Sequence, residues 1–267
     1  MHIAITREVS QSIENCELTH LERTPINHAT ARDQHAAYET VLASLGYQIQ
    51  RLPAEPTMPD SVFVEDVAVV LDEIAIITRP GALSRRDERP SIERALRPYR
   101  QLAHFKSPGI LDGGDVLRVG RDIWIGVSSR SNIDAINQFR FYVGCHGYQV
   151  HSVNVRDCLH LKSAVTAVDD TTVLVNPARV DLSNFKNQQC IQVDPSEPEA
   201  ANVLRVGPTV IAASAFPRTA ALIEAAGFAV VTVDASELAK AEGALTCCSL
   251  LFDMPVYEPH QPPPPAG

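Results

Sequence analysis

Short runs of β-branched and aliphatic residues recur along the chain in pairs, and two or three turn-forming residues join the members of each pair. This alternation of apolar runs and tight polar turns is typical of antiparallel β-hairpins. The pattern predicts four hairpins, with arms at residues 67–71 and 74–78, 116–119 and 123–126, 164–168 and 172–175, and 203–206 and 210–213.

Two further regularities indicate that the hairpins belong to a repeated unit. The pentapeptide Val-Leu-Arg-Val-Gly forms the first arm of a hairpin at residues 116–120 and again at 203–207. A glycine followed by an aromatic residue and a further strand recurs at Gly46, Gly147 and Gly227, and glycine commonly ends a helix. Each module therefore reads hairpin, helix, strand. Helices are predicted at residues 29–44, 88–97, 131–144 and 217–226.

Repeated units of three strands and one outer helix favour a closed ring such as a propeller. In a closed ring, the N-terminal strand at residues 2–6 completes the module that the C-terminal strand at 247–252 begins. The sequence therefore predicts an α/β fold, a five-module propeller formed by a single domain over residues 1–257. Residues 258–267 are rich in proline, which cannot pair in a sheet, and are predicted to form a disordered tail.

Composition narrows the range of partners and locations. With 23 Lys and Arg against 32 Asp and Glu, the formal net charge is -9, which opposes binding to nucleic acid or to an anionic membrane. No run approaches the ~20 apolar residues of a membrane span, and the first residues do not resemble a signal peptide. Six cysteines without a C-x-x-C pair favour reduced thiols in the cytoplasm. The sequence leaves open whether the protein is a monomer or a homodimer.

The familiar cofactor and hydrolase motifs do not occur: the chain has no phosphate-binding loop, dinucleotide fingerprint, H-E-x-x-H or G-x-S-x-G. Polar clusters lie instead at the ends of predicted strands, and they could carry chemistry. These clusters are residues 60–66, 111–115, 158–163 and 245–250.

Each of these clusters has a structural and a functional interpretation. Asp60, Glu65 and Asp66 form either an acidic turn or a binding site for a planar cation such as guanidinium, which pairs with carboxylates in bidentate fashion. The glycines of 111–115 form either a simple turn or a close approach of the backbone to a ligand, next to an aspartate that orients a histidine or a cationic substrate. His160 is either a structural or a catalytic histidine.

Two cysteines and two arginines extend the candidate set. Cys247 and Cys248 fall on the predicted last strand, where alternation would place one in the core and leave the other as a nucleophile. Arg85 and Arg130 follow successive hairpins at the same position in the module, as solvated surface charges or as ligands of an anion. The spacing of the cysteines and histidines matches no standard zinc site.

Taken together, these residues resemble the dimethylarginine dimethylaminohydrolase family, whose members convert Nω-methylated arginines into citrulline. The family belongs to the pentein superfamily of five-bladed α/β propellers, which agrees with the module count. The resemblance extends to about residue 252 and is carried by residues 60–66, 77–81, 84–86, 111–115, 159–163, 200–202 and 246–249.

The resemblance implies a catalytic role for three residues. Cys247 matches the nucleophile, in the Thr-Cys-Cys-Ser form of the mammalian members, and His160 matches the general acid and base. Asp112 matches the acidic member of the triad, which is Asp in mammalian and Glu in some bacterial members. The nucleophile would form a covalent thiouronium with the substrate, and water would release L-citrulline.

The resemblance also implies a set of substrate contacts. Glu65 and Asp66 would surround the guanidinium, and Asp60 would bind the α-amino group. Arg85 and Arg130 would hold the α-carboxylate. Leu18 would belong to a mobile lid, and Ala241 would supply a backbone contact.

Other functions remain open at this point. One is a sister activity on another guanidine, as in arginine deiminase-like enzymes or amidinotransferases. Another is a non-catalytic protein that binds arginine analogues. The resemblance implies that neither a metal nor an organic cofactor is required, and that zinc could inhibit by coordinating Cys247 together with His160.

Overall fold

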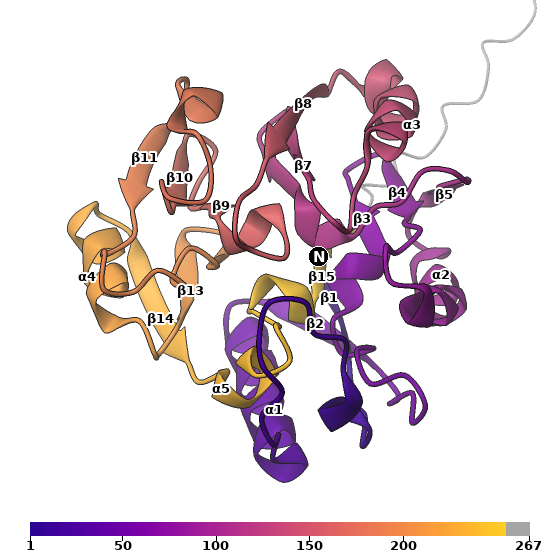
Figure 1. The fold of residues 1–267 in the computed structure, drawn as a ribbon, viewed down its shortest axis with the longest axis horizontal. Coiled ribbons are helices and arrows are strands. Elements are labelled where there is room, and N and C mark those ends of the chain that lie inside the picture. Colours follow the sequence, from indigo (N-terminus) through magenta and orange to yellow (C-terminus); the bar gives the residue numbers. More distant parts are fainter. Residues whose placement is uncertain (255–267) are drawn as a thin grey trace, which may run out of the picture.

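The computed structural model describes residues 1–254, which form five three-stranded sheets arranged around a common centre (Figure 1). Every sheet contains one antiparallel and one parallel pair of strands. In four of the sheets a hairpin supplies the antiparallel pair, and in all five a longer crossover supplies the parallel pair, as the connection of parallel strands requires. The predicted five-module α/β propeller is therefore confirmed.

The strands follow the chain order around the ring, except that the last strand joins the first sheet. The sheets are β15 (Leu250–Asp253), β1 (His2–Arg7) and β2 (Tyr47–Leu52); β3 (Ala68–Val70), β4 (Ile74–Ile77) and β5 (Gln101–His104); β6 (Val116–Val119), β7 (Asp122–Val127) and β8 (Gln149–Asn154); β9 (Val165–Ala167), β10 (Thr172–Val175) and β11 (Gln189–Gln192); and β12 (Leu204–Val206), β13 (Thr209–Ala213) and β14 (Ala229–Val233).

Pairing between the two ends of the described chain closes the ring. β1 runs antiparallel to β15, with Ile3 opposite Phe252, and parallel to β2. Figure 1 shows β15, in yellow, beside β1 near the centre of the molecule. The prediction that the first and last strands share a module is thus confirmed.

The four predicted helices are present within two residues of their predicted ends. Asn27 caps the first and Asn132 the third, since each side chain accepts a hydrogen bond from a backbone N–H in the first turn. A short fifth helix follows β14. The helices are α1 (His28–Ser44), α2 (Arg89–Leu96), α3 (Ile133–Val143), α4 (Pro217–Ala225) and α5 (Ser236–Ala239).

The module of β9, β10 and β11 departs from the predicted hairpin-helix-strand order. Its crossover contains a 3₁₀ turn at Leu182–Phe185 where the other modules have an α-helix. The connection starts with Asn176 and Pro177, and proline disfavours helical backbone both at its own position and at the residue before it.

The core consists of five apolar clusters, each between two neighbouring modules. Successive residues of β1 show why: Ile3 and Ile5 pack toward the module of β3 and β4, while Ala4 packs toward that of β12 and β13. Since side chains alternate across a strand, both faces of each sheet are buried and the modules hold one another in place.

The last strand begins later than predicted. Cys247 and Cys248 lie in a 3₁₀ turn at Thr246–Cys248, and β15 starts at Leu250. The backbone N–H of Cys247 donates to the carbonyl of Ala244, 3.1 Å away, a bond within a turn and not between strands. The argument from strand alternation was therefore wrong for these two cysteines.

Among residues 1–254, no helix is long and apolar enough to cross a bilayer. The predicted boundary at residue 257 and the predicted proline-rich tail at 258–267 lie outside the described residues.

Candidate active site

Most of the predicted site residues line one pocket. Its volume is about 320 Å³, including the space that is open to solvent. Seven of the ten predicted residues line it: Asp60, Asp66, Arg85, Arg130, His160, Ala241 and Cys247. The remaining three are Leu18, Glu65 and Asp112.

The 3₁₀ turn before β15 presents Cys247 to this pocket, with 7% of its surface exposed. Burial raises the pKa of the Cys247 thiol well above its ordinary value, and the carboxylates of Asp66 and Glu65 raise it further. Cys248 is not part of the lining, and its Sγ donates to the carbonyl of Ala244. The turn thus gives the two cysteines different surroundings.

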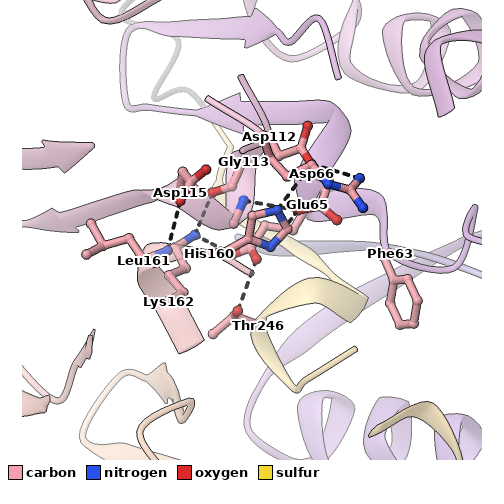
Figure 2. A network of polar contacts seen from close by, with 12 residues as sticks. Phe63, Glu65, Asp66, Asp112, Gly113, Asp115, His160, Leu161, Lys162 and Thr246 are labelled. Carbon is pink, nitrogen blue, oxygen red and sulfur yellow. Dashed lines mark hydrogen bonds and ion pairs between the residues drawn. The ribbon is translucent and has the colours of Figure 1, made fainter. Parts of the chain in front are cut away.

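His160 lies between two buried carboxylates (Figure 2). Its Nε2 atom is 3.1 Å from Oδ2 of Asp112, and its Nδ1 atom is 3.9 Å from Oδ1 of Asp66. Burial lowers the pKa of His160, but the charge of Asp66 and the hydrogen bond to Asp112 outweigh it and raise the pKa to about 9. At neutral pH, the imidazole is therefore positively charged and can act as an acid.

Asp112 stands behind His160 and is fully buried. Its Oδ1 accepts a hydrogen bond from the backbone N–H of Gly81, and this bond fixes the carboxylate. The following glycines allow the close packing: a Cβ on Gly114 would be 2.5 Å from Nδ1 of His160, and one on Gly113 would be 1.9 Å from the carbonyl oxygen of Glu65. The predicted approach of this backbone to a ligand stays a prediction; the structure shows a close approach to His160 and Glu65.

Arg85 is buried and fully engaged with protein groups. It forms ion pairs with Asp66 and with Glu88, and it donates to the backbone carbonyls of Asp60 and Phe63. Burial lowers the pKa of Arg85, but the neighbouring carboxylates raise it well above its ordinary value. Arg85 therefore holds Asp66 in place from behind, and the structural interpretation as solvated surface charge was wrong.

Asp60 and Arg130 both contact the segment that follows Cys16. The backbone N–H of Glu17 donates to Oδ2 of Asp60 at 3.1 Å, and Nη2 of Arg130 donates to the hydroxyl of Thr19 at 2.9 Å. Leu18 lies between these two contacts, half-buried and packed against the neighbouring apolar cluster. The predicted lid residue thus sits next to the two predicted ligands of the substrate's charged ends.

Glu65 turns away from the pocket although it precedes Asp66 in the chain. It pairs with Nζ of Lys162 and accepts from the hydroxyl of Thr246 (Figure 2). It also lines a second, larger cavity. Burial raises the pKa of Glu65 to about 7, against the opposing effect of the Lys162 charge. In this structure, Glu65 therefore supports the turn that contains Cys247, and Asp66 is the carboxylate beside His160.

One group of side chains could hold a metal ion. The ligand atoms of Asp66, Asp112 and His160 lie within 4.8 Å of one another, and all three residues are buried. Cys247 is not a member of this group within residues 1–254, so inhibitory coordination by Cys247 and His160 stays a prediction.

Sequence reasoning missed five residues of the lining. Leu159 and Glu17 are direct neighbours of predicted site residues, and Phe63 lies inside the acidic segment, so proximity in sequence was the available signal. Glu242 and Gly243 follow Ala241, in a segment without any polar cluster that would mark it.

Comparison with known sequences agrees with this geometry. The family model described as N,N dimethylarginine dimethylhydrolase, eukaryotic, matches residues 5–251. The chain is 38% identical to a dimethylarginine dimethylaminohydrolase of Streptomyces coelicolor, over 92% of this chain and 95% of that protein. Its identity to the enzyme of that name from Pseudomonas aeruginosa is 32%, over 94% and 99% of the two chains.

Solved structures share the fold. The Pseudomonas aeruginosa enzyme, as a cysteine-to-serine mutant complexed with citrulline, superposes with a TM-score of 0.88 at 33% identity, covering 93% of this chain and 98% of that one. The N-terminal domain of ArgZ, a cyanobacterial arginine dihydrolase, gives a TM-score of 0.86 at 18% identity and covers 96% and 98%; this shows a common fold only. On the sequence matches along nearly its whole length, the chain belongs to the dimethylarginine dimethylaminohydrolase family.

Proposed function

We propose that this protein hydrolyses Nω,Nω-dimethyl-L-arginine and Nω-monomethyl-L-arginine to L-citrulline and dimethylamine or methylamine, with Cys247 as nucleophile. The observation that carries the proposal is the pocket that joins Cys247, His160 and Asp66, with Asp112 behind the imidazole. The family relationship supplies the substrate class.

Substrate binding would use the charges around the pocket. Asp60 would receive the α-ammonium group and Arg130 the α-carboxylate. Two observations support this assignment: both residues line the pocket, and both contact the segment around Leu18. Arg85 would act on the substrate mainly by fixing Asp66, which faces the guanidinium end beside His160.

The chemistry starts from a protonated thiol, since burial and the nearby carboxylates disfavour the thiolate. A guanidinium ion in the pocket would offset those negative charges, so that the thiol releases its proton to solvent water when the substrate binds. Sγ then forms a bond to the guanidinium carbon. His160, as imidazolium, protonates the departing dimethylamine as its C–N bond breaks, leaving a covalent thiouronium.

Hydrolysis of the thiouronium would reverse the role of His160. Its neutral imidazole takes a proton from the attacking water, the C–O bond forms, and the C–S bond breaks to return Cys247 and L-citrulline. Asp112 keeps the imidazole oriented in both half-reactions through the bond to Nε2.

The direct test is to incubate the purified protein separately with dimethylarginine, monomethylarginine and arginine, and to quantify citrulline and the released amine. We expect turnover of the two methylated substrates and none by Cys247→Ser, which should still bind substrate in a calorimetric titration. Cys248→Ser is the matched control, since Cys248 does not line the pocket, and should retain most of the activity.

The same assay separates the alternative functions. Ammonia from unmethylated arginine would indicate a deiminase-like enzyme, and transfer of the amidino group to an added amine would indicate a transferase. Tight binding without product would indicate a binding protein. A Cys247→Ser variant that forms citrulline at close to the wild-type rate would refute Cys247 as the nucleophile.

Several expectations stay predictions. Inhibition by zinc predicts that added Zn²⁺ suppresses activity and that a chelator restores it. Independence from metal and organic cofactors predicts full activity after exhaustive dialysis against the chelator. A cytoplasmic location and a homodimeric state remain to be tested, the latter by light scattering in solution.

A further inference from the structure

A single buried side chain joins the segments that carry the nucleophile and the general acid. The amide nitrogen of Asn202 donates to the backbone carbonyl of Lys162 and to the hydroxyl of Thr246, both at 3.0 Å. Its amide oxygen accepts from the backbone N–H of Thr246 at 3.2 Å. Thr246 immediately precedes Cys247, and Lys162 follows His160 by two positions. Only 7% of the Asn202 surface is exposed.

The bonds of Asn202 belong to a closed ring of polar contacts. The hydroxyl of Thr246 donates to Oε2 of Glu65 at 3.0 Å, and Glu65 pairs with Nζ of Lys162, whose carbonyl leads back to Asn202 (Figure 2 shows all but Asn202). Lys162 Nζ also donates to the carbonyl of Gly113, 3.2 Å away. The ring therefore touches a residue beside Cys247, one beside Asp112 and one close to His160.

The donors and acceptors of Asn202 are well matched to this position. An amide offers two N–H donors and one carbonyl acceptor, and all three functions are used. An aspartate of the same shape would keep the acceptor and lose both donors. Because Asn202 and Thr246 are both buried, losing these bonds would leave polar partners unsatisfied, and the turns to which the partners belong would shift.

We propose that Asn202 is a positioning residue for the reaction, which holds the turn of Cys247 and the turn after His160 at a fixed separation. The inference rests on the proposed function and extends it to a residue that does not line the substrate pocket. Attack and proton transfer need the thiol and imidazole in one geometry, and a displacement of about 1 Å costs on the order of 100-fold in rate.

The test compares Asn202→Ala and Asn202→Asp with Asn176→Ala. Asn176 is the matched control, because it is also a buried amide and uses its side chain twice, donating to the carbonyl of Pro198 and accepting from the N–H of Ala178, in bonds that do not involve the catalytic turns. We expect both Asn202 variants to lose about 10- to 100-fold in kcat with KM within about threefold. Asn176→Ala should keep kcat within about twofold at a comparable loss of melting temperature.

Conservative variants at Thr246 supply a second readout. Thr246→Ser keeps the hydroxyl, so its kcat should stay within about threefold of wild type. Thr246→Val removes the hydroxyl, so its kcat should fall about tenfold or more. If either Asn202 variant keeps kcat within about twofold, or loses no more than Asn176→Ala at equal melting temperature, the positioning role is refuted.

Hydrogen exchange tests the inference without substrate. In Asn202→Ala, peptides covering residues 244–249 and 160–164 should both exchange faster than in wild type, and they should be unchanged in Asn176→Ala. If both peptides exchange faster in Asn202→Ala but the wild-type protein forms no citrulline, the proposed function is refuted and the structural link between the two turns still holds. Unchanged exchange in an active enzyme would refute the link alone.

Discussion

The Nε2 atom of His160 lies 3.1 Å from Oδ2 of Asp112, although 48 residues separate the two in the chain. Asp112 has no exposed surface, and the N–H of Gly81 binds its other oxygen, so the carboxylate cannot follow the imidazole if the ring turns. The contact orients the ring and leaves Nδ1 on the side of Asp66, 3.9 Å from its Oδ1.

Replacing Asp112 by Asn should weaken the acid function of His160. The hydrogen bond to Asp112 and its charge both raise the His160 pKa, so their loss lowers it. We expect kcat to fall about 100-fold and the alkaline limb of the pH profile of kcat to move to lower pH. Steady-state rates between pH 6 and pH 10 measure both effects; an alkaline limb at the wild-type position would contradict this role of Asp112.

Alkylation of Cys247 in the free enzyme should be slow at neutral pH. Burial and the carboxylates of Asp66 and Glu65 raise the thiol pKa, so the reactive thiolate increases with pH and continues to increase above the range in which an ordinary thiol, with a pKa of about 8.5, levels off. Mass spectrometry of the Cys247 peptide after timed exposure to iodoacetamide gives the rate, with glutathione as reference. If the alkylation rate of Cys247 levels off at a lower pH than that of glutathione, the raised pKa of Cys247 is ruled out.

Loss of Arg130 should mainly affect substrate binding, whereas loss of Arg85 should mainly affect the stability of the fold. Arg130→Ala removes the predicted ligand of the substrate carboxylate, so KM should rise about tenfold or more with a smaller change in kcat. Arg85→Ala leaves the buried carboxylates of Asp66 and Glu88 unpaired and should lower the free energy of unfolding by about 3–5 kcal/mol. Denaturant titrations and steady-state kinetics on both variants check this; an unchanged KM in Arg130→Ala would argue against carboxylate recognition there.

Gly114→Ala should disable the enzyme by displacing His160. The added Cβ would stand 2.5 Å from Nδ1 of the imidazole and 2.9 Å from Oδ1 of Asp66, so the ring must move and the rate should fall about 100-fold. Gly144→Ala is the control, because its Cβ meets nothing within 4 Å and its backbone is helical. Equal citrulline formation by the two variants would show that the contact with Gly114 does not position His160.

Local patterns were sufficient for the architecture. Hairpins and helix ends depend on residues close together in the chain. The hairpin that turns at Asp72 and the helix end at Gly147 could therefore be predicted without tertiary information. The module of β9, β10 and β11 departed from the predicted repeat, because its crossover folds as a 3₁₀ turn. A second exception was the last strand, where an apolar run containing Cys247 looked like strand but folded as a 3₁₀ turn.

The sequence by itself determined a ring of five modules, a net negative charge and a set of polar segments that together match one family. Only the tertiary structure decided how those segments meet. Glu65 and Asp66 are adjacent and equally acidic, yet one pairs with Lys162 and the other faces His160, because the turn that contains them directs neighbouring side chains to opposite partners. Such directions depend on packing between modules distant in the chain, which no local pattern of residues encodes.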